Sequence, residues 1–339
     1  MNGWTRSTVK SNPEHNMKRY LFPADYMADP SVHVFDGKLY IYPSHDRESG
    51  IPEDDFGSHF DMKDYHMLSL EGPDPMSSPI KDHGIILRLE DIPWAGRQLW
   101  DCDVARKNGK YFLYFPAKDK TDIFRFGVAV ADRPEGPFIP QPAPMMGSYS
   151  IDVCVFEDDG RHYFYFGGIW GGQLQRYRDN KALDTGSTFP VDDEPAIPPR
   201  VALLRDDMLE FAEAPRPLVI LDRDGQPLKA GDNQRRFFEA SWMHKYNGKY
   251  YYSYSTGDTH RLCYAIGDNP YGPFVYQGVI LTPVVGWTTH HSIVEYGGKW
   301  WLFHHDSVPS GGRTWLRSLK VCELNYNRDG TIRTVDGLD

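Results

Sequence analysis

One pattern of apolar and polar positions recurs five times along the chain. An apolar strand leads into a tight polar turn that ends in glycine, and a strand rich in aromatic residues follows. The five segments are Ser31–Asp46, Val104–Asp119, Val153–Gly168, Ser241–Thr256 and Ser292–Asp306. Turns of the D-G, N-G and G-G type favour hairpins, because glycine adopts positive φ without a steric penalty. Each segment therefore predicts a β-hairpin.

Further turns extend two of these hairpins to four strands. The motif D-x-P-x-G-P-F at Asp132–Phe138 and Asp268–Phe274 follows an apolar strand each time, which is typical of a connection between a third and a fourth strand. Val201–Ala214 is either a helix or a strand followed by a turn. Five similar units predict an all-β chain that forms a single five-bladed β-propeller over residues 1–339, and a β-sandwich is the alternative. The blades are expected at residues 26–72, 98–140, 150–215, 237–283 and 289–335. A strand near the N-terminus that completes the last blade would close the ring.

Composition agrees with this fold and excludes several classes of protein. Aromatic residues make up 14% of the chain, with 31 Gly and 26 Pro, which favours aromatic strands joined by turns and excludes disorder. The net charge of −10, without a basic run, predicts neither a nucleic-acid nor a membrane partner. No apolar stretch approaches the roughly 20 residues that a membrane helix needs.

Cysteine spacing and the first residues bear on the compartment. The first twenty residues contain no apolar segment of the kind found in a secretion signal. The cysteines are far apart in sequence, which favours buried free thiols over a disulfide framework or a zinc site. They are Cys102, Cys154, Cys263 and Cys322. Both observations lead us to expect a cytoplasmic protein.

Acidic residues and one histidine stand at the start of the first strand of the five units. They lie six to nine residues before the turn glycine, at Asp29, Asp103, Asp152, Glu239 and His290. In a propeller the first strands line the central axis, so these positions converge. Clustered carboxylates near apolar strands push their pKa values apart, and acid–base catalysis needs such a difference. Each residue taken singly is a turn or capping residue; the set favours a catalytic site.

The motifs around these positions resemble those of glycoside hydrolase family 43. They are A-D-P-S at Ala28–Ser31, S-I-D at Ser150–Asp152, F-E-A-S at Phe238–Ser241 and T-H-H-S-I at Thr289–Ile293. The resemblance covers all five units, in order and in register with the repeat. It implies a five-bladed propeller that hydrolyses glycosides with inversion.

The resemblance also implies roles for three carboxylates. Asp29 matches the general base, Glu239 the general acid, and Asp152 the residue that raises the pKa of the acid and orients the substrate. Inversion needs a base and an acid about 6.5–9.5 Å apart, with room for a water molecule, and we expect that separation for Asp29 and Glu239. Asp103 falls where relatives often have Ala-Pro-Asp, and the departure from that motif makes a structural or supporting role the expectation.

One metal ion and no organic cofactor follow from the same resemblance. His290 matches a histidine that in many relatives approaches a metal ion, commonly calcium, in the axial channel. It binds such an ion either directly or through water, because calcium prefers oxygen ligands. The alternative is a buried histidine that is hydrogen-bonded to the backbone.

Sugar recognition should use aromatic faces and polar edges. The candidates are Trp170 and Gln173 in one glycine-rich loop, with Trp100, Trp94 and Phe35 elsewhere. Arg317 resembles an arginine that contacts the sugar in relatives, and its alternative is a salt bridge within the last blade. Most Trp residues of a propeller pack between blades.

The predicted function is exo-acting hydrolysis that releases xylose, arabinose or both from xylo-oligosaccharides and arabinoxylo-oligosaccharides. The insertion Glu48–Lys63 is expected to wall one side of the pocket mouth. Two alternatives remain open. One is an endo-arabinanase or another glycosidase on the same scaffold, and the other is a non-catalytic propeller that binds carbohydrate.

Overall fold

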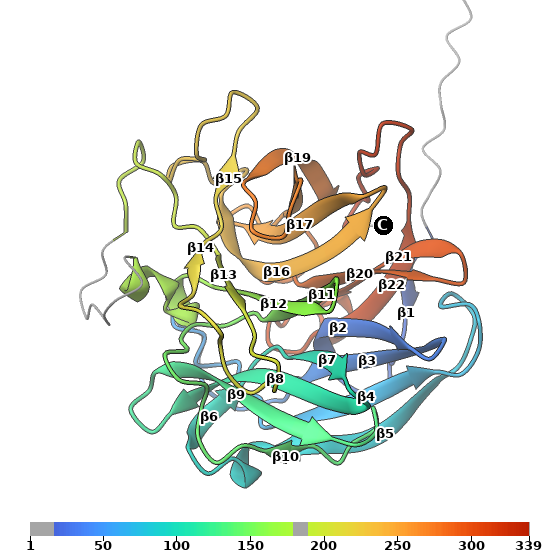
Figure 1. The fold of residues 1–339 in the computed structure, drawn as a ribbon. Helices are drawn as coiled ribbons and strands as arrows, with labels where there is room; N and C mark the ends of the chain where they lie inside the picture. The colour runs from blue at the N-terminus through green and yellow to red at the C-terminus, as the bar shows by residue number, and fades with distance from the viewer. Residues whose placement is uncertain (1–16, 179–188, 339) are drawn as a thin grey trace, which may run out of the picture.

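Five small β-sheets surround a common axis in the computed structural model, which describes residues 17–178 and 189–338 (Figure 1). The first strand of each sheet contacts the first strand of the next, so that the five inner strands form a closed ring. In ring order they are β2 (Met27–Phe35), β7 (Asp103–Lys107), β11 (Cys154–Asp158), β16 (Phe237–Tyr246) and β20 (His291–Tyr296). This arrangement confirms the predicted five-bladed β-propeller.

The outer strands follow each inner strand in chain order, with few exceptions. The first sheet adds β3 (Lys38–His45), β4 (Asp64–Leu70) and β5 (Ile80–Arg88). The second adds β8 (Lys110–Asp119), β9 (Phe124–Ala131) and β10 (Ile139–Pro140), and β6 (Ala95–Leu99) pairs with the far end of β8. The third adds β12 (Arg161–Phe166), β13 (Arg200–Leu203) and β14 (Arg216–Pro217). The fourth adds β17 (Lys249–Thr256), β18 (Leu262–Gly267) and β19 (Phe274–Leu281), with β15 (Ile220–Leu221) parallel to β19. The fifth adds β21 (Lys299–Asp306), β22 (Ser318–Leu324) and β1 (Arg19–Tyr20).

Helical structure is confined to single turns within the described residues. These 3₁₀ turns are η1 (Leu89–Asp91), η2 (Trp170–Gly172), η3 (Leu174–Tyr177) and η4 (Val308–Ser310). Residues Val201–Ala214 form a strand and a turn, which settles the choice that the sequence left open. In the part of the chain that the structure describes, no helix is long and apolar enough to cross a membrane.

Strand pairing closes the ring as predicted and moves several expected blade boundaries. β1 pairs with β22, with Arg19 opposite Val321, so an N-terminal strand completes the last blade. Both D-x-P-x-G-P-F turns join third and fourth strands, β9 to β10 and β18 to β19. The first blade was expected to end at residue 72, but β5 pairs along β4 and extends that blade to Arg88. β14 extends the third blade to Pro217, and β15 adds Ile220–Leu221 to the fourth blade.

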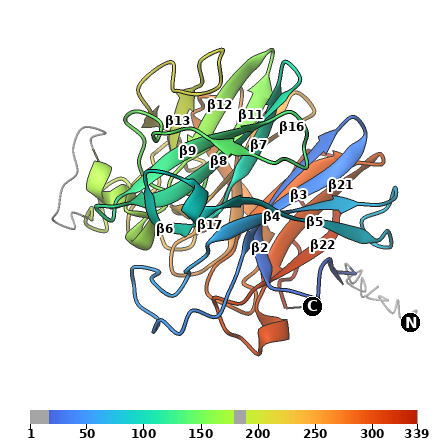
Figure 2. The same ribbon diagram turned by 90° about the horizontal axis from the view of Figure 1, so that it is seen from below.

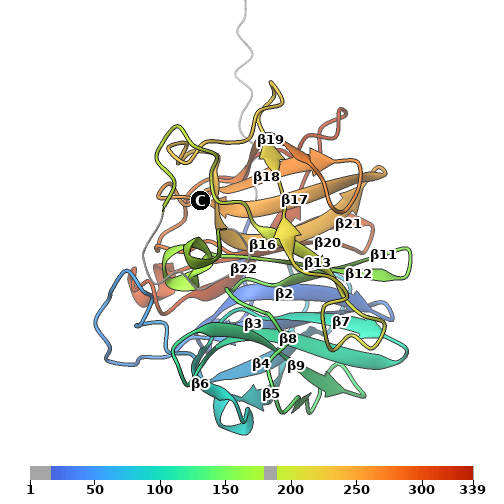
Figure 3. The ribbon, with the colours of Figure 1, turned by 60° about the vertical axis from the view of Figure 1, so that its left-hand side comes forward.

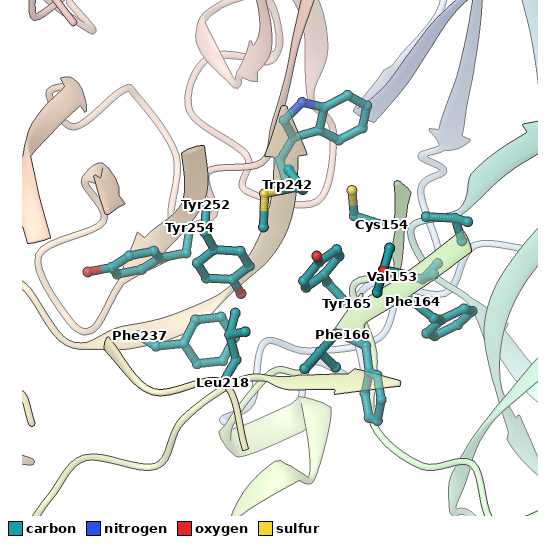
Figure 4. Close-up of a cluster of buried hydrophobic side chains, with 14 of the residues drawn as sticks. Val153, Cys154, Phe164, Tyr165, Phe166, Leu218, Phe237, Trp242, Tyr252 and Tyr254 are labelled. Carbon is teal, nitrogen blue, oxygen red and sulfur yellow. The ribbon is translucent and has the colours of Figure 1, made fainter. Parts of the chain in front are cut away.

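Aromatic and aliphatic side chains fill the spaces between neighbouring blades. Figure 4 shows one such layer, in which Tyr165 of the third blade faces Tyr252 of the fourth, with ring centroids 6.0 Å apart. Phe164 points the other way and contacts Tyr114 and Phe126 of the second blade. The first and last sheets lie side by side in Figure 2, and their shared layer includes Ile41, Leu68, Trp301 and Phe303. The four cysteines are buried and unpaired, as their spacing predicted. The high aromatic content therefore serves mainly as packing between blades.

Candidate active site

The strand pairing is interrupted at three of the acidic residues that face one end of the axis. The pairing of β2 with β3 shifts register between Ala28 and Ser31, on either side of Asp29. The pairing of β16 with β17 shifts on both sides of Glu239. Asp101 lies in the gap between β6 and β7, both of which pair with β8. Such bulges re-aim side chains that regular alternation would place elsewhere.

Left-handed backbone accompanies these interruptions. The φ angles are +46° at Asp29, +61° at Asp152 and +63° at Ala240, the residue after Glu239. A non-glycine residue held in this region costs about 1–3 kcal/mol, and such residues cluster at functional sites. The fold therefore accepts strain in order to direct several carboxylates toward one point.

These carboxylates line one cavity of about 240 Å³ at that end of the axis. Asp29, Asp101, Asp152, Glu239 and His290 form its floor, and Arg317 lines it as well. Of the candidates proposed for sugar contact, Trp100, Trp170 and Arg317 lie at the cavity. Phe238 and Trp287 add two further aromatic residues to its wall.

The loop between β3 and β4 walls one side of the cavity, as the insertion Glu48–Lys63 predicted. Its residues Asp54, His59 and Phe60 line the cavity, and the loop extends well beyond the first sheet in Figure 3. The neighbouring blade fixes this loop in place. The Gln98 side chain donates to the Gly57 carbonyl at 2.8 Å, and the indole N–H of Trp100 donates to the Phe60 carbonyl at 2.9 Å. These hydrogen bonds make the loop a fixed part of the cavity wall.

Asp29 is held as an anion. The Arg317 guanidinium donates to its Oδ1 at 2.7 Å, and the ring nitrogens of His305 and His290 lie 3.5 and 3.7 Å from the same oxygen. Burial alone would raise the pKa of Asp29, but Arg317, with His305 and His290, lowers it to about 2. Asp29 is therefore ionised at any ordinary pH.

Arg317 joins the last blade to the first rather than bridging within its own blade. Besides Asp29, its guanidinium makes two hydrogen bonds to the Asp46 carboxylate, at 2.7 and 2.8 Å. The backbone N–H of Arg317 donates to Asp46 as well, at 2.8 Å. Burial would lower the pKa of Arg317, but both carboxylates raise it, so the cation is permanent. Arg317 therefore does not form the salt bridge within the last blade that was its alternative role; it bridges two blades and also lines the cavity.

Glu239, in contrast to the ionised Asp29, holds its proton. Burial raises its pKa well above the usual range for glutamate, and the nearby charges of Asp152 and Asp29 raise it further. One cavity therefore holds an anionic Asp29 and a protonated Glu239. That is the pair of states that acid–base chemistry uses.

Asp101 is a site residue that the sequence analysis missed. Its carboxylate accepts hydrogen bonds from the backbone N–H groups of Asp152 and Val153, at 3.0 and 2.9 Å. Asp152 in turn accepts from the N–H of Ala240 at 2.6 Å, which links the second, third and fourth blades. The signal was spacing: Asp101 stands eight residues before Gly109, as Asp29, Asp152 and His290 do before their own turn glycines.

Asp103 has the structural role that was one of its expected roles. It is fully buried, accepts from Ser31 Oγ and the Val155 N–H, both at 2.5 Å, and lies 2.6 Å from His33 Nε2. These contacts tie the first three inner strands together further along the axis. Asp103 does not line the cavity.

Asp101, Asp152 and His290 together form a donor set that fits a divalent cation. Their ligand atoms all lie within 4.8 Å of one another, and all three residues are buried. Burial raises the pKa of Asp101, and the charge of Asp152 raises it further. A divalent cation would relieve this repulsion, and carboxylate oxygens are ligands that calcium prefers.

Three of the residues proposed for sugar binding lie elsewhere. Phe35 is at the far end of β2, stacked on His33 with ring centroids 5.6 Å apart, and faces the opposite end of the axis. Both ends of the Gln173 amide are used internally, because it accepts from the Phe124 N–H and donates to the Asp122 carbonyl. Trp94 stacks on Phe115 with centroids 6.1 Å apart. The side chains of all three build the scaffold.

Comparisons with known proteins agree with this geometry. The sequence matches Glycosyl hydrolases family 43 over residues 80–332. It is 72% identical to a xylosidase/arabinosidase of Bacteroides ovatus, over 95% of this chain and 98% of that protein. It is 65% identical to a β-xylosidase of Xylanibacter ruminicola, over 94% of this chain and 99% of that protein.

Solved structures show the same likeness. A β-xylosidase structure has a TM-score of 0.93 and 68% identity, covering 95% of this chain and 99% of that one. A family 43 β-xylosidase/α-arabinofuranosidase from a compost microbial metagenome, solved in complex with xylotriose and in a calcium-free form, has a TM-score of 0.92 and 60% identity. It covers 96% of this chain and 99% of that one.

Proposed function

Since this chain belongs to family 43 of the glycoside hydrolases, we propose that it is an inverting, exo-acting enzyme that releases xylose and arabinose from xylo-oligosaccharides and arabinoxylo-oligosaccharides. The observation that carries the proposal is the opposite ionisation of Asp29 and Glu239 in one cavity. The walled cavity and the β-xylosidase and xylosidase/arabinosidase relatives support the choice of substrate.

Glu239 acts as the general acid in this proposal. Its proton passes to the glycosidic oxygen as the bond from that oxygen to the anomeric carbon breaks. A carboxylic acid is able to do this near neutral pH only if its pKa is raised, and burial with the charges of Asp152 and Asp29 provides that.

Asp29 acts as the general base. It takes a proton from a water molecule whose oxygen attacks the anomeric carbon from the face opposite the leaving group, so the product has inverted configuration. Arg317 keeps Asp29 ionised and fixes its orientation through the hydrogen bond to Oδ1. Asp152 is anchored by the Ala240 N–H, next to Glu239, and contributes the negative charge that keeps the acid protonated.

A calcium ion is the metal that we assign to Asp101, Asp152 and His290. Bound there, it would supply positive charge to the cavity and link the second, third and fifth blades. His290 also faces Asp29 at 3.7 Å, so this residue connects the metal position to the base.

Two measurements on the full chain test the proposal. Release of p-nitrophenol from the β-D-xylopyranoside and the α-L-arabinofuranoside gives the specificity, and proton NMR of the first xylose released from xylobiose gives the stereochemistry. We expect turnover of both aryl glycosides and α-xylose as the initial product. Initial β-xylose would overturn inversion, and xylobiose instead of xylose plus xylotriose as the first product from xylotetraose would overturn exo cleavage.

A further inference from the structure

A row of charged and imidazole side chains crosses the first blade outside the active-site cavity. His45 at the end of β3 lies opposite Asp64 at the start of β4, with 2.6 Å between His45 Nδ1 and Asp64 Oδ1. His66, two residues along β4, places its Nε2 3.8 Å from the same oxygen. Residues two apart on a strand share a face, so the three side chains stand together on rigid backbone.

The outward nitrogen of each histidine is already held by another carboxylate. His66 Nδ1 lies 3.0 Å from Asp82 on β5, and His45 Nε2 lies 3.2 Å from Asp25. The inward nitrogens, His45 Nδ1 and His66 Nε2, are therefore turned toward Asp64. Carboxylates that orient the remote nitrogen of a histidine are the usual outer partners of metal-binding imidazoles.

We propose that His45, Asp64 and His66 form a binding site for a zinc-class transition-metal ion, separate from the axial donor set. Their ligand atoms all lie within 4.8 Å of one another. Zinc binds such nitrogens and oxygens at about 2.0–2.2 Å, which places neighbouring ligand atoms roughly 3.3 Å apart in a tetrahedron. Two imidazoles and one carboxylate favour zinc over calcium, which prefers oxygen ligands alone. The metal replaces the proton that His45 and Asp64 share, and water completes its coordination.

The position of this site gives it a structural consequence. Asp25 lies on the connection that leads from β1 of the last blade to β2 of the first. Its contact with His45 therefore ties the metal position to the segment that closes the ring. Asp46, the next residue after His45, points to the other face of the strand and holds Arg317. A metal ion here stiffens the junction of the first and last blades without entering the active-site cavity.

The test is metal binding by the full chain after treatment with a chelator. Zn²⁺ is titrated by calorimetry, and Co²⁺ is used in its place for visible absorption, which reports coordination geometry. The variants are His66→Ala and Asp64→Asn, the second nearly isosteric in case the first does not fold. The matched control is His83→Ala, a histidine of the same blade that contacts Ser69 and lies outside the cluster.

We expect one Zn²⁺ per chain in the wild type and in the control, at least tenfold weaker binding in both cluster variants, and a rise in melting temperature with Zn²⁺ only where the site is intact. Equal Zn²⁺ affinity in all four proteins would overturn the proposal. So would Zn²⁺ binding that survives Asp64→Asn but is lost in His290→Ala, because that result places the ion on the axis. Absence of stoichiometric binding to the wild type would show that the cluster is a hydrogen-bond network only.

Discussion

The two ends of the central axis are built by the same five inner strands and differ in how charge is neutralised. At the far end, a wider cavity of about 850 Å³ is rimmed by paired charges that connect neighbouring blades. Arg106 pairs with Asp36 at 2.7 Å, and Lys245 with Asp158 at 2.7 Å. At the active-site end, the buried acids Asp29, Asp101 and Asp152 and the half-buried Glu239 lie around one buried guanidinium, that of Arg317, which pairs with Asp29.

This difference separates scaffold from chemistry in a repeat protein. At the far end, the charges that pair between blades remain partly exposed to solvent. At the active-site end, interrupted ladders and an excess of buried carboxylates force some groups away from their ordinary protonation state. We therefore expect catalysis at the end where the ladder is broken, and matched substitutions at the two ends test that expectation.

Removing the acid should give the largest effect. Glu239→Gln keeps the shape of the side chain but has no proton to donate, so we expect kcat on xylobiose to fall by about 10²–10⁴. Glu295→Gln, at the far end of β20, should leave kcat unchanged. Steady-state kinetics of both variants, with circular dichroism to confirm folding, make the comparison. Equal loss in the two would show that the two ends do not differ in this way.

Removing the buried cation should be next in size. Arg317→Met leaves Asp29 and Asp46 buried without a counter-charge, which costs about 3–5 kcal/mol in the free energy of unfolding. Arg106→Met breaks an exposed pair at the far end and should cost about 0–1 kcal/mol. Urea denaturation measures both. Similar costs for the two arginines would contradict the assigned difference in burial.

Aromatic residues at the two ends should separate binding from packing. Trp170→Ala removes part of the cavity wall, and we expect KM to rise about tenfold, equivalent to roughly 1.4 kcal/mol. Phe35→Ala should leave KM unchanged and lower stability, because Phe35 packs on Tyr40 and Tyr111. Kinetics and melting temperatures decide this. A raised KM in Phe35→Ala would contradict this placement, because it would show that Phe35 contacts the sugar.

The smallest effect should be that of pH across the neutral range. Activity requires ionised Asp29, whose pKa is about 2, and protonated Glu239, whose pKa is raised, so kcat/KM should stay level through mildly acidic pH and fall on the alkaline side. The stability that Asp29 contributes is present above the ordinary pKa of 3.8 and is lost as pH falls through about 2. Measuring kcat/KM as a function of pH tests both the acidic and the alkaline limb of the profile. An acidic limb near the ordinary pKa of aspartate or above it would contradict the ionisation assigned to Asp29.

The fold and most of the candidate catalytic residues were predictable from the sequence, because equivalent positions in the five repeats can be found by counting from the turn glycines. Counting back from the turn glycines is enough to place Asp29, Asp152, Glu239 and His290 at one end of the axis. The spacing of eight residues that Asp29, Asp152 and His290 share selects Asp101 over Asp103, whereas Glu239 stands nine residues before its glycine. The run Asp101-Cys102-Asp103 concealed this, because the break between β6 and β7 that separates the two aspartates has no signal in the sequence.

The direction and contacts of individual side chains were less predictable, for physical reasons. Phe35 and Trp100 are both aromatic residues near an inner strand, and the sequence does not say which end of the axis each faces. Gln173 lies in a glycine-rich loop that resembles a binding loop. Its side-chain oxygen nevertheless accepts a hydrogen bond from the backbone N–H of Phe124. Such hydrogen bonds join segments about 50 residues apart, so no local sequence pattern predicts them.

Ring closure has a consequence for synthesis of the chain. Asp29 belongs to the first blade and Arg317 to the last, 288 residues later. A ribosome therefore synthesises Asp29, Glu239 and four blades before it reaches Arg317. The ring closes only when β22 has paired with β1 and β21. We therefore expect hydrolytic activity only from chains whose translation has run through the last blade.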